Sequence, residues 1–162
     1  MIRPILLVAF AMTCLVLLSC TKQSERRSAF GIAKDDEEMN DAMAEARTSI
    51  QSFITPLINP APTQTNFSLK AKFQERDAIE HIWLSDPTYD GKQFSGTVGN
   101  NPEELSNVKF GDVVTVSIDR VSDWMYVDAG VLKGGFTIRV LRNRMSEEER
   151  KLFDQEFPYR FE

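Results

Sequence analysis

The side chains that could perform chemistry in this chain are few, and they centre on one imidazole. His81 is the only histidine among 162 residues. An imidazole can act as a general base near neutral pH when a carboxylate orients it, and Glu80 or Asp123 would supply that carboxylate. A nucleophile would have to come from Ser85 or Ser95, but the sequence has no G-x-S-x-G nucleophile elbow. We therefore assign no catalytic residue and keep a hydrolase with His81 as general base as an alternative.

Metal and cofactor chemistry finds little support in the residue types. With one histidine and two cysteines, the chain cannot assemble a four-ligand Cys/His zinc site. No HxxE-type helical pair of metal ligands occurs, and His81 falls within a predicted strand. The pair Gly134-Gly135 precedes a predicted strand instead of opening a helix, so we interpret it as a bend and not as a phosphate cradle. The sequence therefore predicts no metal and no cofactor.

Aromatic side chains suggest a binding role in place of catalysis. If the strands that carry Trp83 and Trp124 share a sheet, their rings could line one groove, with charged side chains at its edge. Aromatic faces with a few polar groups suit a sugar, a peptide or a loop of a partner protein. The alternative is that both tryptophans belong to the core, where large aromatic side chains are usually buried. The predicted ligand-binding residues are His81, Trp83, Asp123, Trp124, Tyr126 and Arg139.

The first twenty residues have the layout of a secretory signal. Arg3 supplies a positive charge, residues 5–18 form an uncharged apolar run, and the segment closes on LLSC. These last four residues resemble the lipobox of bacterial lipoproteins, which implies that residues 1–19 are removed and that Cys20 is lipidated. The apolar run of 14 residues is shorter than the roughly 20 that span a bilayer. We therefore expect a lipid anchor at Cys20, and Thr21 after it favours the outer membrane, facing the periplasm.

Composition indicates one domain on a tether and argues against nucleic acid as a partner. Without residues 1–19 the chain keeps 18 basic and 24 acidic side chains and has no Lys/Arg block. Cys14 is removed with the signal and Cys20 carries the lipid, so no disulfide is expected. Residues 20–36 are polar and aperiodic, which is typical of a flexible linker. Residues 37–162 then form the predicted globular domain.

Hydrophobic periodicity predicts an α+β fold for this domain. Apolar residues at helical spacing from Met39 to Leu57 predict one amphipathic helix, which Asn59-Pro60 ends. Ser146 and Glu149 form a capping box that starts a short terminal helix through Phe157. Between the helices we expect about six short antiparallel strands in a curved sheet or a small SH3-like barrel. These strands are predicted at residues 67–73, 79–84, 94–98, 114–118, 124–127 and 136–140.

Several motifs follow one another in a distinctive order between residues 39 and 153. They are EHIWL from Glu80, GTVGNNP from Gly96, GDVV from Gly111, SDWMY from Ser122 and GGFTIR from Gly134. A chain with these motifs resembles the YegJ-like family of bacterial proteins, which carry a domain of unknown function. The resemblance covers nearly the whole predicted domain. It implies no catalytic residue and no substrate.

Three functions remain open at this level. The favoured one is a non-enzymatic, lipid-anchored module that binds a protein or an envelope ligand, and an immunity-like role against a basic toxin is one form of it. The second is a hydrolase of envelope polymers that uses His81. The third is a structural component of the envelope without a discrete ligand.

Overall fold

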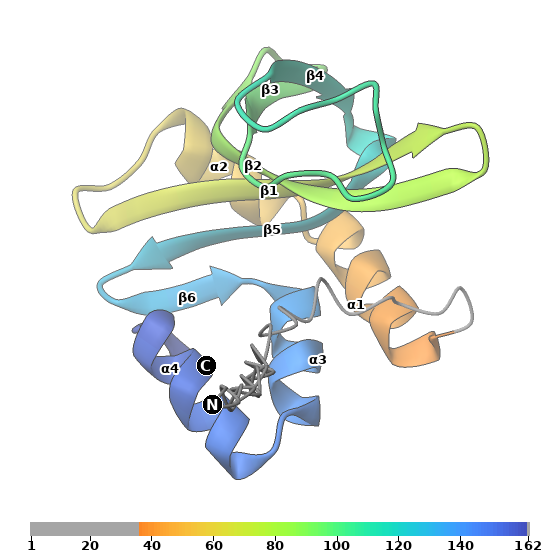
Figure 1. Cartoon of the computed structure of the whole chain (residues 1–162). Coiled ribbons are helices and arrows are strands. Elements are labelled where there is room, and N and C mark those ends of the chain that lie inside the picture. The colour runs from red at the N-terminus through yellow and green to blue at the C-terminus, as the bar shows by residue number, and fades with distance from the viewer. Residues whose placement is uncertain (1–35, 162) are drawn as a thin grey trace, which may run out of the picture. The chain divides into compact units, whose positions relative to one another are not determined.

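A computed structural model describes residues 36–161 (Figure 1). The predicted signal peptide, Cys20 and the linker up to residue 35 lie outside the described residues. Within them the chain forms four α-helices and one seven-stranded sheet, which confirms the α+β class. The helices are α1 Glu37–Thr48, α2 Gln51–Ile58, α3 Phe136–Arg144 and α4 Glu147–Glu156. The strands are β1 Gln64–Glu75, β2 Ala78–Tyr89, β3 Gln93–Val98, β4 Val113–Ser117, β5 Val121–Asp128, β6 Val131–Gly134 and β7 Arg160–Phe161.

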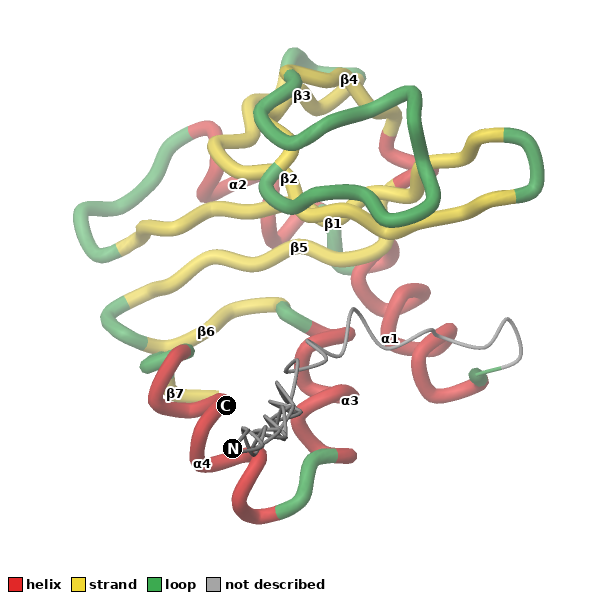
Figure 2. Tube along the Cα trace, in the orientation of Figure 1, coloured by secondary structure: helices red, strands yellow, loops and turns green. Residues whose placement is uncertain are grey.

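The sheet is curved but does not close into a barrel. Its strand order is β4-β3-β2-β1-β5-β6-β7, so β4 and β7 are its two edges. All neighbours pair antiparallel except β6 and β7, which are parallel. Figure 2 shows α3 and α4 together beside β6, whereas α2 lies behind the strands at the other end of the sheet. No helix among the described residues is both long enough and apolar enough to cross a bilayer.

The core lies between one sheet face and α2. Phe53 of α2 is fully buried, with its ring centroid 5.6 Å from that of Trp124 and 6.1 Å from that of Phe94. The alternation predicted for residues 67–73 is confirmed, because Leu69 and Ala71 are buried on this face. The arrangement buries apolar area from both layers, which is the main stabilising contribution to the fold.

The helix predicted from Met39 to Leu57 is instead two helices, and a tryptophan explains the break. The indole Nε1 of Trp124 donates to the backbone oxygen of Ala46 at 2.9 Å. In a continuous helix that oxygen would accept from the N–H of Ile50, which bonds to Arg47 O at 3.4 Å instead. The hydroxyl of Ser49 also bonds back to Glu45 O at 2.6 Å, a contact that competes with helix continuation.

The strand predicted at residues 136–140 is wrong, because this segment forms α3. Phe136 and Val140 are four residues apart, so their spacing fits a helix face as well as a strand face. Gly135 precedes the helix in the left-handed region, at φ 66°. The capping box is confirmed, since Ser146 and Glu149 exchange both of its hydrogen bonds at the start of α4.

Candidate functional site

The register of β1, β2 and β5 places the predicted site residues on two opposite faces of the sheet. Lys70 of β1 pairs with Trp83 of β2 on one side and with Asp123 of β5 on the other. The next residue of β5 is Trp124, which pairs with Leu69 of β1, and both side chains lie in the hydrophobic core. Successive side chains of a strand point to opposite faces. Trp83 and Trp124 therefore do not share a groove, contrary to the sequence-based expectation.

Asp123 is a structural residue of the interior and not the edge of an open groove. It is fully buried and its carboxylate accepts from the backbone N–H groups of Trp124 (2.8 Å), Phe136 (3.1 Å) and Thr137 (2.8 Å). The hydroxyl of Thr137 donates to it at 2.6 Å. Burial raises the pKa of this carboxyl, while the hydrogen bonds and the charge of Lys70 act in the opposite direction. The carboxylate thus occupies the N-terminus of α3, a position that favours an anion.

This contact also corrects the interpretation of the glycine pair. Gly134-Gly135 does open a helix, but the anion at that helix start is Asp123 of the same chain. Gly134 has φ 72°, and a Cβ there would lie 2.1 Å from the backbone oxygen of Trp124. Close packing of backbone on backbone therefore explains this glycine.

His81 has cations around it and no carboxylate to orient it. Burial, followed by the positive charges of Lys70, Lys72 and Arg47, lowers its pKa to about 4. Its Nδ1 is buried without a hydrogen bond among the described residues. Glu80 faces elsewhere, because its carboxylate accepts from the backbone N–H groups of residues 103–105. The base and orienter pair that a hydrolase would need is not formed.

Lys70 is the unexpected member of this row. It is 8% exposed, its Nζ lies 5.6 Å from the Trp83 ring centroid, and it donates to Thr137 Oγ1 at 3.4 Å. Burial lowers the pKa of its ammonium, and the nearby charge of Asp123 partly offsets this. The row Trp83, Lys70 and Asp123 thus links three strands to α3.

The other predicted residues meet at a hollow of about 500 Å³ beside β6, to which Trp124, Tyr126 and Arg139 all contribute. Their polar groups are engaged within the fold. Arg139 donates to the backbone oxygens of Gly134 and Leu132, each at 3.0 Å. Trp124 is 4% exposed and its indole N–H is bonded to α1. The hollow therefore offers little free recognition chemistry.

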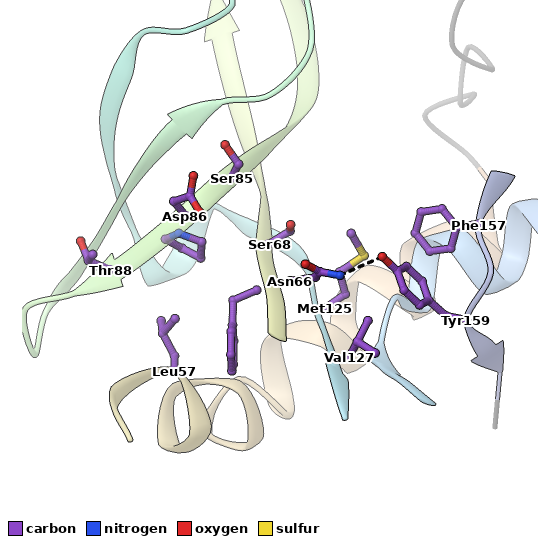
Figure 3. A pocket seen from close by; sticks show the side chains of 12 residues that line it. Leu57, Asn66, Ser68, Ser85, Asp86, Thr88, Met125, Val127, Phe157 and Tyr159 are labelled. Carbon is purple, nitrogen blue, oxygen red and sulfur yellow. Dashed lines mark hydrogen bonds between the residues drawn. The ribbon is translucent and has the colours of Figure 1, made fainter. Parts of the chain in front are cut away.

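The larger cavity, about 660 Å³, lies where the sheet forks (Figure 3). The pairing of β1 with β2 runs from Glu75↔Ala78 to Ser68↔Ser85 and then stops. Beyond that point β1 stays paired with β5, at Thr65↔Val127, and β2 stays paired with β3, at Thr88↔Ser95. The two strands therefore separate, and their inner edges no longer pair with each other. We call this opening the fork cleft.

Local sequence explains why the strands separate. Asn66 and Asp86 both have left-handed backbone conformations, at φ 55° and 49°. Asparagine and aspartate tolerate this region better than other residues with side chains. Pro87 follows Asp86 and has no N–H to give to a neighbouring strand. Each strand thus bends away immediately after the last pair.

Apolar groups form the base and one wall of the fork cleft. Leu57 projects from α2 at its base, and Met125 and Val127 of β5 line the side (Figure 3). The wall is completed by Phe157 and Tyr159, whose ring centroids lie 5.0 Å apart. The remaining lining is polar: Asn66, Ser68, Ser85, Asp86 and Thr88, with Phe67 and Pro87 between them.

One hydrogen bond ties the C-terminal wall to β1. Asn66 Nδ2 donates to the hydroxyl of Tyr159 at 2.9 Å (Figure 3). The two residues are 93 positions apart, so no local pattern predicts that they meet. The pair Asp86-Pro87 does indicate that β2 becomes irregular at this point, because proline in a strand marks an edge or a bulge.

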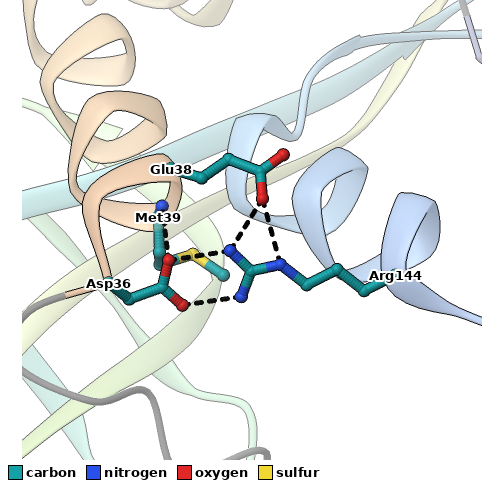
Figure 4. A network of polar contacts seen from close by, with 4 residues as sticks. All are labelled: Asp36, Glu38, Met39 and Arg144. Carbon is teal, nitrogen blue, oxygen red and sulfur yellow. Dashed lines mark hydrogen bonds and ion pairs between the residues drawn. The ribbon is translucent and has the colours of Figure 1, made fainter.

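The start of the domain is fastened separately by an ionic cluster (Figure 4). Asp36 caps α1 by accepting from the N–H of Met39 at 3.1 Å. Arg144, near the end of α3, donates to Asp36 at 2.6 and 2.7 Å and to Glu38 at 2.7 Å. Hydrogen bonding to Arg144 is the main reason that the pKa of Asp36 falls to about 2. The cluster joins the start of α1 to the end of α3.

Comparison with known proteins shows the family of this chain. The family described as "Uncharacterized protein conserved in bacteria (DUF2314)" matches residues 36–161, the whole described domain. The chain belongs to this family. The DUF2314 chain is 34% identical over 115 residues to the uncharacterized protein YegJ of Escherichia coli K12, covering 71% of this chain and 74% of YegJ. The YegJ-like resemblance expected from the sequence is thus confirmed.

A second relative of the DUF2314 chain is longer. It is a putative ankyrin repeat protein of Neisseria meningitidis serogroup B, 35% identical over 131 residues. The match covers 76% of this chain but 52% of that protein, so the chain spans about half of its length. No solved structure matches the chain significantly.

Proposed function

We propose that this DUF2314 protein is a lipid-anchored binding module of the bacterial cell envelope and that the fork cleft is its binding site. The observation that carries the proposal is the open fork between β1 and β2. Two strand edges, an apolar base and an exposed carboxylate face one cavity of about 660 Å³. Sites of this size with mixed lining suit ligand binding.

The chemistry of the cleft favours binding over catalysis. The ionisable groups in its lining are the carboxylate of Asp86 and the phenol of Tyr159, and Tyr159 is held by Asn66. His81 is not part of the lining and has no carboxylate bonded to it among residues 36–161. A general acid and base pair needs two groups within reach of one reacting atom. The cleft has no such pair.

Two further features support a tethered binder. The LLSC segment at Cys20 has the pattern of a lipidation site, and two or more acyl chains hold a protein stably on a membrane. An immunity-like role is one form of this function, because residues 36–161 carry 21 acidic and 14 basic side chains, a balance that suits a basic partner.

Site-specific photo-crosslinking in living cells tests the binding site. A photoreactive amino acid replaces Thr88 on the rim of the fork cleft, and a matched protein carries it at Thr115, an exposed position of β4 outside the cleft. We expect a discrete adduct from position 88, no such adduct from position 115, and loss of the adduct when Ser68→Trp fills the cleft. An adduct that survives Ser68→Trp, or equal labelling from both positions, would overturn the assignment of the site.

The anchor is tested on the full chain by mass spectrometry of its N-terminal peptide. We expect an acylated Cys20 as the first residue, and we expect Cys20→Ala to release the protein from the membrane fraction. A protein that retains an unmodified Met1 and stays in the soluble fraction after the membranes are pelleted would exclude the anchor.

A further inference from the structure

The geometry points to an extended peptide as the ligand of the fork cleft, paired through its main chain with the free edge of β1 and presenting a basic side chain to Asp86. This inference rests on the proposed function and names the chemical class of the ligand. It treats the cleft as a place where a strand from a partner protein completes the sheet.

The free edge of β1 gives the peptide its main-chain partner. Residues 64–67 lie beyond the last pair with β2, while their other edge keeps its pairs with β5 at Gln64 and Thr65. The N–H of Gln64 bonds to the backbone oxygen of Ala61 at 2.9 Å, so the edge that remains for a ligand is residues 65–67. An extended chain rises about 3.3 Å per residue, so this edge has room for a segment of about three residues. Backbone groups that point into a cleft need a partner, from water or from a ligand, and a strand supplies several at once.

The opposite edge is a poorer partner for a peptide. Pro87 of β2 has no N–H to donate, whereas residues 64–67 of β1 include no proline. A left-handed residue occurs on each edge, Asp86 in β2 and Asn66 in β1, so the missing donor at Pro87 is what distinguishes them. The ligand strand therefore pairs with β1 and lies alongside β2. Asp86 then serves as a side-chain contact instead of a main-chain one.

The negative charge of Asp86 at the rim of the fork cleft favours a basic side chain in the ligand peptide. Asp86 is exposed and makes no hydrogen bond or ion pair within residues 36–161, so its carboxylate is available to a ligand. It is also the one charged side chain among the residues that line the described cleft. A lysine or arginine at every second position of the peptide would face it, and the intervening apolar residues would face Leu57 and Phe67.

Two peptides with matched backbones test the charge contact. The probe is a blocked hexapeptide of alternating valine and lysine, titrated into the detergent-solubilised full chain and followed by NMR shifts of residues 64–67. The comparison peptide carries glutamate in place of lysine. We expect Asp86→Asn to lower the affinity for the lysine peptide about two- to fivefold, as for an exposed ion pair. The control variant Asp77→Asn should leave this affinity unchanged. Asparagine keeps the left-handed conformation, so the fold is preserved.

A backbone-modified peptide tests main-chain pairing. N-methylation of alternate amides leaves the side chains intact and removes donors, so affinity should fall about tenfold or more when two hydrogen bonds are lost. Equal binding of the methylated peptide, or indifference to Asp86→Asn, would overturn the inference. If no peptide binds while position 88 still forms an adduct that Ser68→Trp abolishes, the ligand class is wrong and the binding site stands. If that adduct persists in Ser68→Trp, the proposed function itself fails.

Discussion

Replacing Asp123 by alanine should destabilise the domain by several kcal/mol, because this carboxylate holds α3 on the sheet. Three backbone N–H groups and the hydroxyl of Thr137 donate to it, all from within the interior. Alanine would leave these four donors without an acceptor. It would also leave the ammonium of Lys70, which is 8% exposed, without its nearest described opposite charge.

The expected loss can be sized from the burial of these groups. Leaving a buried donor without its acceptor costs about 1–3 kcal/mol, and four donors lose their acceptor here, so a total loss of about 3–5 kcal/mol is expected. Domains of this size have unfolding free energies of about 5–15 kcal/mol. A melting temperature lower by about 10–20 °C follows. Asp123→Asn should cost less, since its side-chain oxygen still accepts, but its amide would point a donor at the donors of Thr137.

Thermal unfolding and urea titration monitored by circular dichroism measure these changes. Asp41→Asn is the matched control, because Asp41 is exposed on α1 and its replacement should alter stability by less than about 0.5 kcal/mol. Combining Asp123→Asn with Lys70→Met removes both charges and should recover part of the loss. A loss below about 1 kcal/mol for Asp123→Ala would refute the view that this carboxylate caps α3.

Three other perturbations have directions fixed by the structure. Gly134→Ala should cost more than about 3 kcal/mol in urea unfolding, because its Cβ would overlap a backbone oxygen, whereas Gly91→Ala should cost only about 1 kcal/mol, since the space around Gly91 is open. The His81 imidazole should show a pKa of about 4 when it is titrated by NMR. Because this pKa is lower than in the unfolded chain, its contribution to stability is present above about pH 6.5 and is lost as pH falls toward 4. The loss should be about 2 kcal/mol once solvent screening of the partly exposed ring is allowed for. Arg144→Gln should return the pKa of Asp36 from about 2 toward its ordinary value, again by NMR, with a small loss of stability that disappears at high salt.

Each of these has a result that would contradict it. Equal costs for the two glycine variants would mean that the backbone near Trp124 can yield. A pH dependence between 6.5 and 4 that persists in His81→Phe would assign it to other groups. An unchanged pKa of Asp36 in Arg144→Gln would show that the N–H of Met39 alone sets it.

The elements that sequence predicts well here are those whose signals are local. The alternation around Leu69 and Ala71 and the capping box at Ser146 each involve residues within a few positions of one another. Such patterns depend on the 2.0 and 3.6 residue periods and on turn chemistry. They were enough to establish an α+β domain.

The errors arose where a distant residue decides the local structure. Trp124 takes the carbonyl of Ala46, 78 positions earlier, and so helps to split the predicted N-terminal helix. Asp123 caps a segment 13 positions later, and so favours α3 over a strand. In both cases the local pattern suited two structures, and one long-range hydrogen bond selected between them.

By itself the sequence determined the class of the domain and its residue inventory, because these depend on composition and local periodicity, and its ordered motifs resemble those of the family that the comparisons show. Only the tertiary structure decided how its chemistry is distributed. The pairing of Lys70 with both Trp83 and Asp123 put the two tryptophans on opposite faces, since one step of register reverses the direction of every side chain. The fork cleft also depends on the tertiary structure. Asp86-Pro87 marks an irregular point in β2, but the cleft is completed by Leu57 of α2, by β5 and by Phe157 and Tyr159, which are distant in the chain.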